Sequence, residues 1–120
     1  MQNRFYRNLL VWQRARRLSI DVFRATSAAP FRREWGFRDQ MRRAAISIPS
    51  NIAEGNERGS DRDAARFFYY ARGWLAELST QADVAAEVGL LDRTLAAAWM
   101  GECEQLARIL AALIRRRLEG

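Results

Sequence analysis

Six polar residues have side chains that could in principle serve a catalytic or ligand-binding site. They form two groups, each with the intervals of three and four that put side chains on one face of a helix: Arg43, Ser47, Asn51 and Glu54, then Glu77 and Gln81. In a catalytic or ligand-binding cluster, Glu54 and Glu77 would be the paired carboxylates of a hydrolase. The same residues also suit a structural hydrogen-bond network between two helices, with Arg43 paired to a carboxylate. The sequence favours this structural network.

Arginine is the second group with chemistry to offer. All twenty cationic side chains are arginine, and the formal net charge is +6. The charge is +8 over residues 1–43, −5 over 44–107 and +3 over 108–120. Clustered arginines bind nucleic acid through phosphate contacts and counterion release. A solvated charged surface is the plainer alternative. We predict RNA or DNA binding, without sequence-specific readout, at Arg14, Arg17, Arg24, Arg38 and Arg42.

The composition also argues against several classes of enzyme. The chain has no histidine, which removes the commonest general base and the imidazole ligands of helical-bundle metal sites. Its single cysteine, Cys103, lies between Glu102 and Glu104, whose charges disfavour a thiolate. No zinc motif or glycine-rich phosphate loop is present. We therefore expect a non-enzymatic protein with no metal and no cofactor.

Hydrophobic periodicity places these residues on helices. Apolar residues recur at intervals of three and four, with no β-type alternation. Helices are predicted at about residues 8–27, 35–56, 61–89 and 92–118. Joined by short loops, they predict one all-α domain over residues 1–120, an antiparallel up-down four-helix bundle. Without a signal peptide or the ~20-residue apolar run that crosses a bilayer, we expect a cytoplasmic protein and no membrane partner.

The helix ends carry recognisable signals. Asn8, Ser60 and Asp92 are the predicted N-caps of the first, third and fourth helices. Gly89 is the predicted C-terminal stop of the third helix. Pro49 lies inside the second helical pattern, where proline removes a backbone hydrogen bond. Because the apolar periodicity continues past Pro49, we predict one helix with a kink near it.

The lost hydrogen bond has a defined acceptor. Proline has no N–H, so Pro49 cannot donate to the Ala45 carbonyl one helical turn earlier. An interrupted bond of this kind costs a helix interior roughly 3 kcal/mol.

The chain has more apolar helix surface than one bundle interior needs. Residues 67–70 are four consecutive aromatics, which point in four directions on a helix. Scattered surface aromatics are the plain alternative. We predict instead that copies of the chain bury this surplus against each other as a homo-oligomer. The predicted interface residues are Phe68, Tyr69, Tyr70 and Trp35.

Three segments together are similar to a known family. They read LLVWQRARRLSIDVF, WGFRDQMRRAAISIPSNIAEG and ARFFYYARGWLAELSTQADVAAEVG. They resemble the four-helix-bundle proteins encoded in intervening sequences of bacterial 23S rRNA genes. The match runs from Leu9 to Leu91, and its most specific part is Gln40–Gly55. The signature positions present in this chain are Arg42, Arg43, Ser47, Pro49, Asn51, Glu54, Glu77 and Gln81.

The resemblance implies an up-down bundle that assembles into a ring, with pentamers known, and no established enzymatic activity. A similar fold occurs in the accessory variability determinant of diversity-generating retroelements, which binds nucleic acid and a reverse transcriptase. The chain departs from the pattern at Trp74, where a small polar residue is usual, and at Ala82, where a larger apolar residue is usual.

Together these observations predict a pentamer-like, ring-forming bundle that binds RNA or DNA through arginine. The partners expected are other copies of the chain, nucleic acid, and a reverse transcriptase or another protein. The alternative is a protein-interaction scaffold with no nucleic-acid role. Salt-sensitive binding distinguishes the two.

Overall fold

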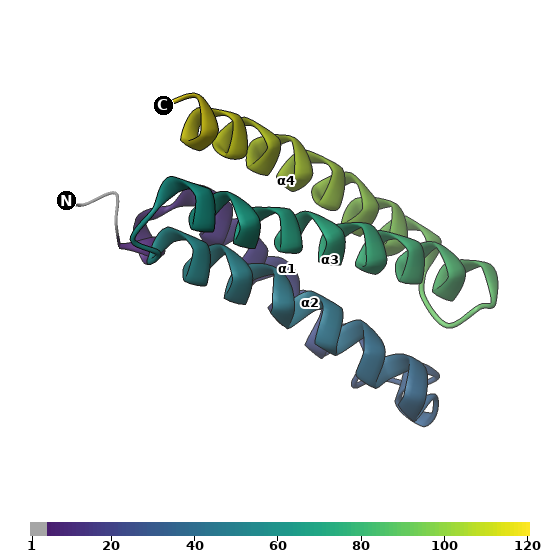
Figure 1. The fold of residues 1–120 in the computed structure, drawn as a ribbon. Helices are drawn as coiled ribbons and strands as arrows, with labels where there is room; N and C mark the ends of the chain where they lie inside the picture. The colour runs from purple at the N-terminus through teal and green to yellow at the C-terminus, as the bar shows by residue number, and fades with distance from the viewer. Residues whose placement is uncertain (1–4) are drawn as a thin grey trace.

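The computed structural model describes residues 5–120. Its four α-helices pack against each other in a body of 46 × 20 × 19 Å, and α1–α2 and α3–α4 form two hairpins side by side (Figure 1). The helices are α1 (Leu10–Ala25), α2 (Trp35–Asn56), α3 (Asp61–Glu87) and α4 (Arg93–Glu119), with short 3-10 helices η2 (Tyr6–Asn8) and η3 (Phe31–Arg33). No strand occurs within residues 5–120. The predicted all-α four-helix bundle is confirmed.

Most of the predicted helix ends are confirmed. The side chains of Ser60 and Asp92 each accept a hydrogen bond, 3.1 Å long, from the backbone N–H three residues on. Gly89 has a φ of 83°, the left-handed conformation that ends α3 without strain. The prediction for Asn8 is wrong: it ends η2, and the N-cap of α1 is Leu9, which supplies no capping side chain. Instead, α1 follows the short 3-10 helix η2 after one residue.

Small residues let α2 and α3 approach closely. A Cβ atom placed on Gly55 would lie 2.9 Å from the Phe68 ring and 3.1 Å from the Ala64 carbonyl oxygen. Gly55 therefore leaves the space that the Phe68 ring fills. Fully buried alanines continue this close packing along the core: Ala44, Ala45, Ala64, Ala71, Ala82 and Ala85.

A serine on α1 compensates for the proline in α2. Helix α2 runs without interruption through the buried Pro49, and the bend predicted there stays a prediction. The Ala45 carbonyl, which Pro49 cannot pair with, accepts a hydrogen bond of 2.6 Å from the Ser19 hydroxyl. Ser19 is itself buried, 4% exposed, and its Oγ also lies 3.1 Å from the Ala15 carbonyl. A side-chain hydrogen bond between α1 and α2 thereby replaces the backbone hydrogen bond that α2 lacks at Pro49.

Candidate interaction surfaces

The six-residue polar group does not form the predicted network between helices. Ser47 donates to the Arg43 carbonyl and Asn51 donates to the Ser47 carbonyl, both over 2.7 Å. These bonds run along α2, because short polar side chains reach the carbonyl four residues earlier on their own helix. Arg43 does not pair with a carboxylate as predicted; its guanidinium carbon lies 5.9 Å from the centre of the Trp74 ring. This contact replaces an ion pair with a cation–π interaction between α2 and α3.

The two candidate carboxylates have separate partners. Glu54, in the last turn of α2, accepts a hydrogen bond of 2.9 Å from Arg58, which follows that helix. Glu77 accepts one of 3.5 Å from the amide of Gln81 within α3. The Gln81 amide oxygen is buried with no hydrogen-bond partner among the described residues. These contacts favour neither a carboxylate pair nor a hydrogen-bonded link between the two helices.

Arg14 links α1 to α4. Its Nε donates to Glu102 Oε2 over 2.9 Å, and its Nη2 donates to Gln105 Oε1 over 2.8 Å. The hydrogen bond to Glu102 raises the pKa of the Arg14 guanidinium above its already high ordinary value. Because these donors already have partners within the protein, Arg14 is a structural residue. Binding of a phosphate by Arg14 would break its hydrogen bonds to Glu102 and Gln105.

Arg42 closes the C-terminal end of α1. Its Nε donates to Thr26 Oγ1 over 2.9 Å, and its Nη2 donates to the Phe23 carbonyl over 3.1 Å and to Ser27 Oγ over 2.8 Å. A cation at this position also complements the negative end of the helix dipole. Arg42 therefore fixes α2 against the end of α1, rather than projecting freely toward solvent.

Two of the five predicted phosphate-binding arginines are unengaged. Arg17 and Arg24 are exposed on α1 and have no ion pair or side-chain hydrogen bond within the described residues. Their spacing of seven residues puts them on one face of α1, two turns apart. Arg38 is partly engaged, because its Nε lies 3.3 Å from a carboxylate oxygen of the neighbouring Asp39. The basic face of α1 is hereafter the surface formed by Arg17 and Arg24.

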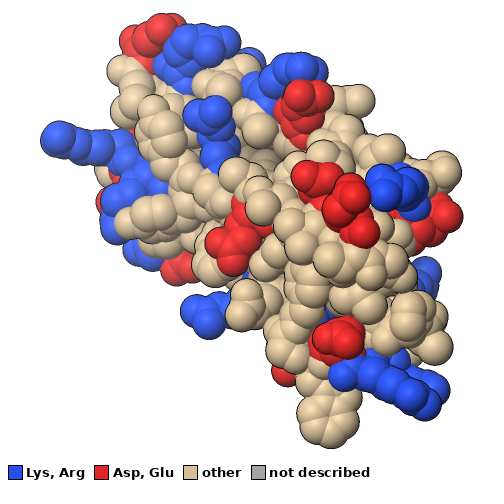
Figure 2. All heavy atoms as spheres, turned by 90° about the vertical axis from the view of Figure 1, so that its right-hand side faces the viewer, with Lys and Arg blue, Asp and Glu red and all other residues tan. Residues whose placement is uncertain are grey.

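Acidic and basic side chains are interspersed on the surface, and Asp21 lies between Arg17 and Arg24 on the same face of α1. Figure 2 looks onto the end of the bundle where α1 joins α2 and α3 joins α4, and blue and red side chains are interspersed there among uncharged ones. Several arginines pair with acids three or four residues away in the sequence, as Arg66 does with Asp63 at 3.1 Å and Arg58 with Glu54 at 2.9 Å. Such short-range pairs leave less free cationic charge than the composition suggests.

The structure corrects one of the predicted interface aromatics. Phe68 is 1% exposed and lies in the core, so it cannot contact another copy of the chain. Its neighbour Phe67 is only partly buried, with the guanidinium of Arg58 4.3 Å from its ring centre. The reason is the space beside Gly55, which receives Phe68 and not the residue before it.

The other three predicted interface aromatics are exposed but do not form one patch. Tyr69 and Tyr70 are adjacent to Phe68, which packs beside Gly55 near the C-terminal end of α2. Trp35, the most exposed of them at 68%, begins α2, about 30 Å away along the helix. Any single contact surface therefore includes the tyrosines or the tryptophan, not both.

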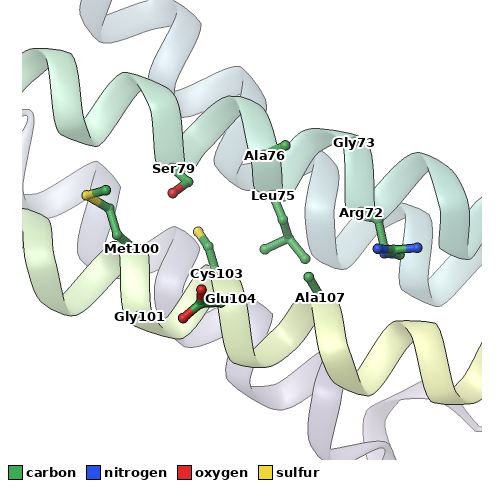
Figure 3. Close-up of a pocket in the computed structure, with 10 residues that line it drawn as sticks. All are labelled: Arg72, Gly73, Leu75, Ala76, Ser79, Met100, Gly101, Cys103, Glu104 and Ala107. Atoms are coloured by element: carbon green, nitrogen blue, oxygen red, sulfur yellow. The ribbon is translucent and has the colours of Figure 1, made fainter.

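A groove follows the outer seam between α3 and α4. Its central cavity, of about 520 Å³, is lined largely by small residues, with Met100 and Arg72 toward opposite ends (Figure 3). A second cavity shares Arg72 and extends to Tyr69 and Leu118. Cys103 also borders the central cavity; burial, with a smaller contribution from Glu102, raises the pKa of its thiol to about 12. The protonated thiol is a packing group rather than a nucleophile.

A second groove lies between α1 and α2. Its volume is about 400 Å³, and its floor includes Trp12, Ile20, Ile46 and Pro49. Arg7 and Arg16 are among its lining residues, as are Tyr6, Ser19, Ser50 and Ala53. We call this cavity the α1–α2 groove. Sequence periodicity missed it because the residues that line it come from two helices and the segment before α1.

Among residues 5–120, no group of three or more His, Cys, Asp or Glu side chains is arranged to hold a metal ion. No helix in that part of the chain combines the length and hydropathy needed to cross a membrane.

Comparison with known proteins gives one family. The model of the family described as 23S rRNA-intervening sequence protein matches residues 7–112. This range includes the basic face of α1, every lining residue of the α1–α2 groove except Tyr6, and most of α4. No curated protein matches the chain.

Proposed function

The chain belongs to the 23S rRNA-intervening sequence protein family, and from this premise and its surface we propose that it is a non-enzymatic, self-associating bundle that binds nucleic acid through arginine. The observation that carries the proposal is the basic face of α1. Arg17 and Arg24 are exposed without a partner among the described residues, whereas Arg14 and Arg42 hold helices together. Unpaired guanidinium groups on one helix face are suited to successive phosphates of a nucleic-acid backbone.

Self-association would enlarge this basic face. Two phosphate-binding side chains on one subunit give weak binding, and several copies in a ring multiply the contacts that one nucleic-acid strand makes. Exposed Tyr69 and Tyr70, 52% and 45% accessible, lie beside the α3–α4 groove and offer apolar surface for such a contact. We propose a cyclic, pentamer-like assembly, with nucleic acid as the main partner beyond the chain itself.

The proposal of a non-enzymatic role is supported by the chemistry of the surface. The chain has no histidine, and the Cys103 thiol is held protonated by burial. Glu54 and Glu77 each accept a hydrogen bond from a side chain four residues away in the sequence. None of these groups is prepared to act as a nucleophile or as a general base.

Fluorescence anisotropy with a labelled RNA and a labelled DNA duplex tests nucleic-acid binding. We expect affinity to fall steeply as salt rises, because each phosphate contact releases a counterion. Replacing both Arg17 and Arg24 by alanine should lower the slope of log affinity against log salt by roughly 2. Arg93→Ala is the control for a single lost charge, since Arg93 is an exposed arginine on α4 that is paired with Glu87.

Absence of binding at low salt would overturn the nucleic-acid proposal and favour a protein-interaction scaffold. An equal loss in the Arg93 control and the double variant would show that net charge, not the basic face of α1, determines affinity. Light scattering tests the assembly separately: a monomer at micromolar concentration would overturn the ring.

A further inference from the structure

The α1–α2 groove differs from the other cavities in charge. Arg7 and Arg16 line it, and no acidic side chain is among its lining residues. Four other cavities on the described surface each include a carboxylate, from Glu104, Glu77, Glu119 or Asp63. A positive groove without carboxylates is complementary to an anion.

The floor of the groove is apolar and aromatic. Trp12 is partly buried against the core, and Ile46, 48% exposed, lines the same floor from α2. Arg7 lies over the floor, with its guanidinium carbon 5.2 Å from the Trp12 ring centre, and has no ion pair among the described residues. A volume of about 400 Å³ is within the range, roughly 300–1,000 Å³, of small-ligand sites. The ligand chemistry indicated is an anion attached to a flat, largely apolar ring.

We propose that the α1–α2 groove binds an unpaired nucleobase of a single-stranded nucleic acid, while Arg7 and Arg16 bind the flanking phosphates. The base enters over the Trp12 indole, and the exposed Arg7 side chain moves from the ring to the phosphate. Arg16 and Arg17 are successive residues about 100° apart around α1, so a strand that continues from the basic face of α1 round the helix reaches the rim of this groove. The inference rests on the proposed nucleic-acid binding and adds its substrate class.

A preference for single strands follows. Paired bases are stacked inside a duplex and cannot enter a side groove, whereas unpaired bases stack on aromatic side chains at a gain of about 1–3 kcal/mol each. A duplex would use only the backbone contacts. The protein should therefore bind a single strand roughly tenfold more tightly than the duplex made from it.

Filling the groove tests this directly. Ile46→Trp adds bulk at a half-exposed position in the groove, and Val84→Trp adds the same bulk at a half-exposed position on α3, so the second variant is the control. Affinities for a labelled single-stranded RNA and for its duplex are measured for both variants, with helical content and assembly state checked by circular dichroism and light scattering. We expect Ile46→Trp to lose roughly tenfold in single-strand affinity and to keep duplex affinity, with Val84→Trp unchanged.

A second variant removes a charge from the groove instead of adding volume to it. Arg16→Ala should weaken single-strand binding more than duplex binding, whereas Arg93→Ala, which loses the same charge elsewhere, should not discriminate. The pair guards against misfolding of the tryptophan variant, because Arg16 is exposed and makes no side-chain hydrogen bond within the described residues.

The outcomes separate this inference from the proposed function. Equal affinity for single strand and duplex, unaffected by Ile46→Trp, would overturn the nucleobase site and leave nucleic-acid binding in place. Absence of binding to either RNA would overturn both. Dissociation of the oligomer by Ile46→Trp but not by Val84→Trp would overturn the inference in another way, because the groove would then hold a second copy of the chain.

Discussion

The two hairpins of the bundle are stabilised differently. Between α1 and α2, Ser19 donates to the Ala45 carbonyl and Arg42 caps the end of α1, in addition to the apolar contacts of both helices. Between α3 and α4, the described side-chain hydrogen bonds include only the contact of 3.5 Å from Arg117 to Asp61 near the chain end. Apart from the exposed ion pair between Glu87 and Arg93, the rest of that seam is packing of apolar and small residues.

The part of this difference that involves Ser19 follows from Pro49. A helix with a complete backbone ladder has no buried carbonyl to satisfy and can pack through apolar side chains alone. Helix α2 has an open carbonyl at Ala45 in its buried face, and its partner α1 must supply a donor there. The proline thereby determines which side chain α1 presents. The following predictions perturb each hairpin, beginning with the largest expected effect.

The apolar hairpin should be the more sensitive to loss of volume. Leu106 on α4 is fully buried, so Leu106→Ala removes buried methylene groups and leaves a cavity. We expect the free energy of unfolding to fall by about 2–5 kcal/mol in urea denaturation. Leu10→Ala, at a position 64% exposed on α1, is the matched control and should change it by less than about 0.5 kcal/mol.

The junction of the two hairpins should be sensitive to added volume. Gly55→Ala places a methyl group against the Phe68 ring and the Ala64 backbone, and the backbone oxygen cannot move away as a flexible side chain would. We expect a loss of about 1–3 kcal/mol in unfolding free energy. Gly73→Ala is the control, because a methyl group there meets no atom within 4 Å. A stabilised Gly55→Ala protein would contradict the close approach of α2 and α3.

The polar hairpin should depend on the cap at the end of α1. Arg42→Ala removes donors to Thr26, Ser27 and the Phe23 carbonyl, at a cost of about 1–2 kcal/mol. Hydrogen exchange should increase most in the last turn of α1. Unchanged exchange at that turn would show that solvent replaces the arginine at no cost.

The smallest effect is expected where the two hairpins meet through α1 and α4. Arg14 and Glu102 are only about 70% buried, so their coupling energy should be about 0.2–1 kcal/mol in a double-mutant cycle. It should weaken as salt rises. A coupling above about 2 kcal/mol would indicate that this pair, rather than the apolar core, orients α1.

Local signals in the sequence were sufficient for the fold. The caps at Ser60 and Asp92 and the stop at Gly89 depend on side chains and backbone within a few residues, and all three are confirmed. Which of the consecutive aromatic residues faces the core could not be predicted from such local signals. Phe67 and Phe68 are 100° apart on one helix, and the choice between them depends on the space at Gly55 in another helix.

The candidate surfaces were less predictable for the same reason. Arg14, Arg17, Arg24 and Arg42 are alike in sequence, yet two of them bind partners on other helices and two do not. Only tertiary structure decides which guanidinium remains free. The role of Ser19 did leave a signal in the sequence. A polar residue on an apolar helix face and a carbonyl that proline leaves unpaired each need a hydrogen-bond partner when buried.

We infer that the Ser19 hydroxyl replaces the backbone N–H donor that Pro49 lacks. A double-mutant cycle between these two residues tests this claim most directly. Ser19→Ala alone should lower the free energy of unfolding by about 1–3 kcal/mol, because the buried Ala45 carbonyl loses its partner. In the Pro49→Ala background the restored N–H supplies that partner, so Ser19→Ala should then cost less than about 0.5 kcal/mol. An equal cost of Ser19→Ala in both backgrounds would contradict the claim.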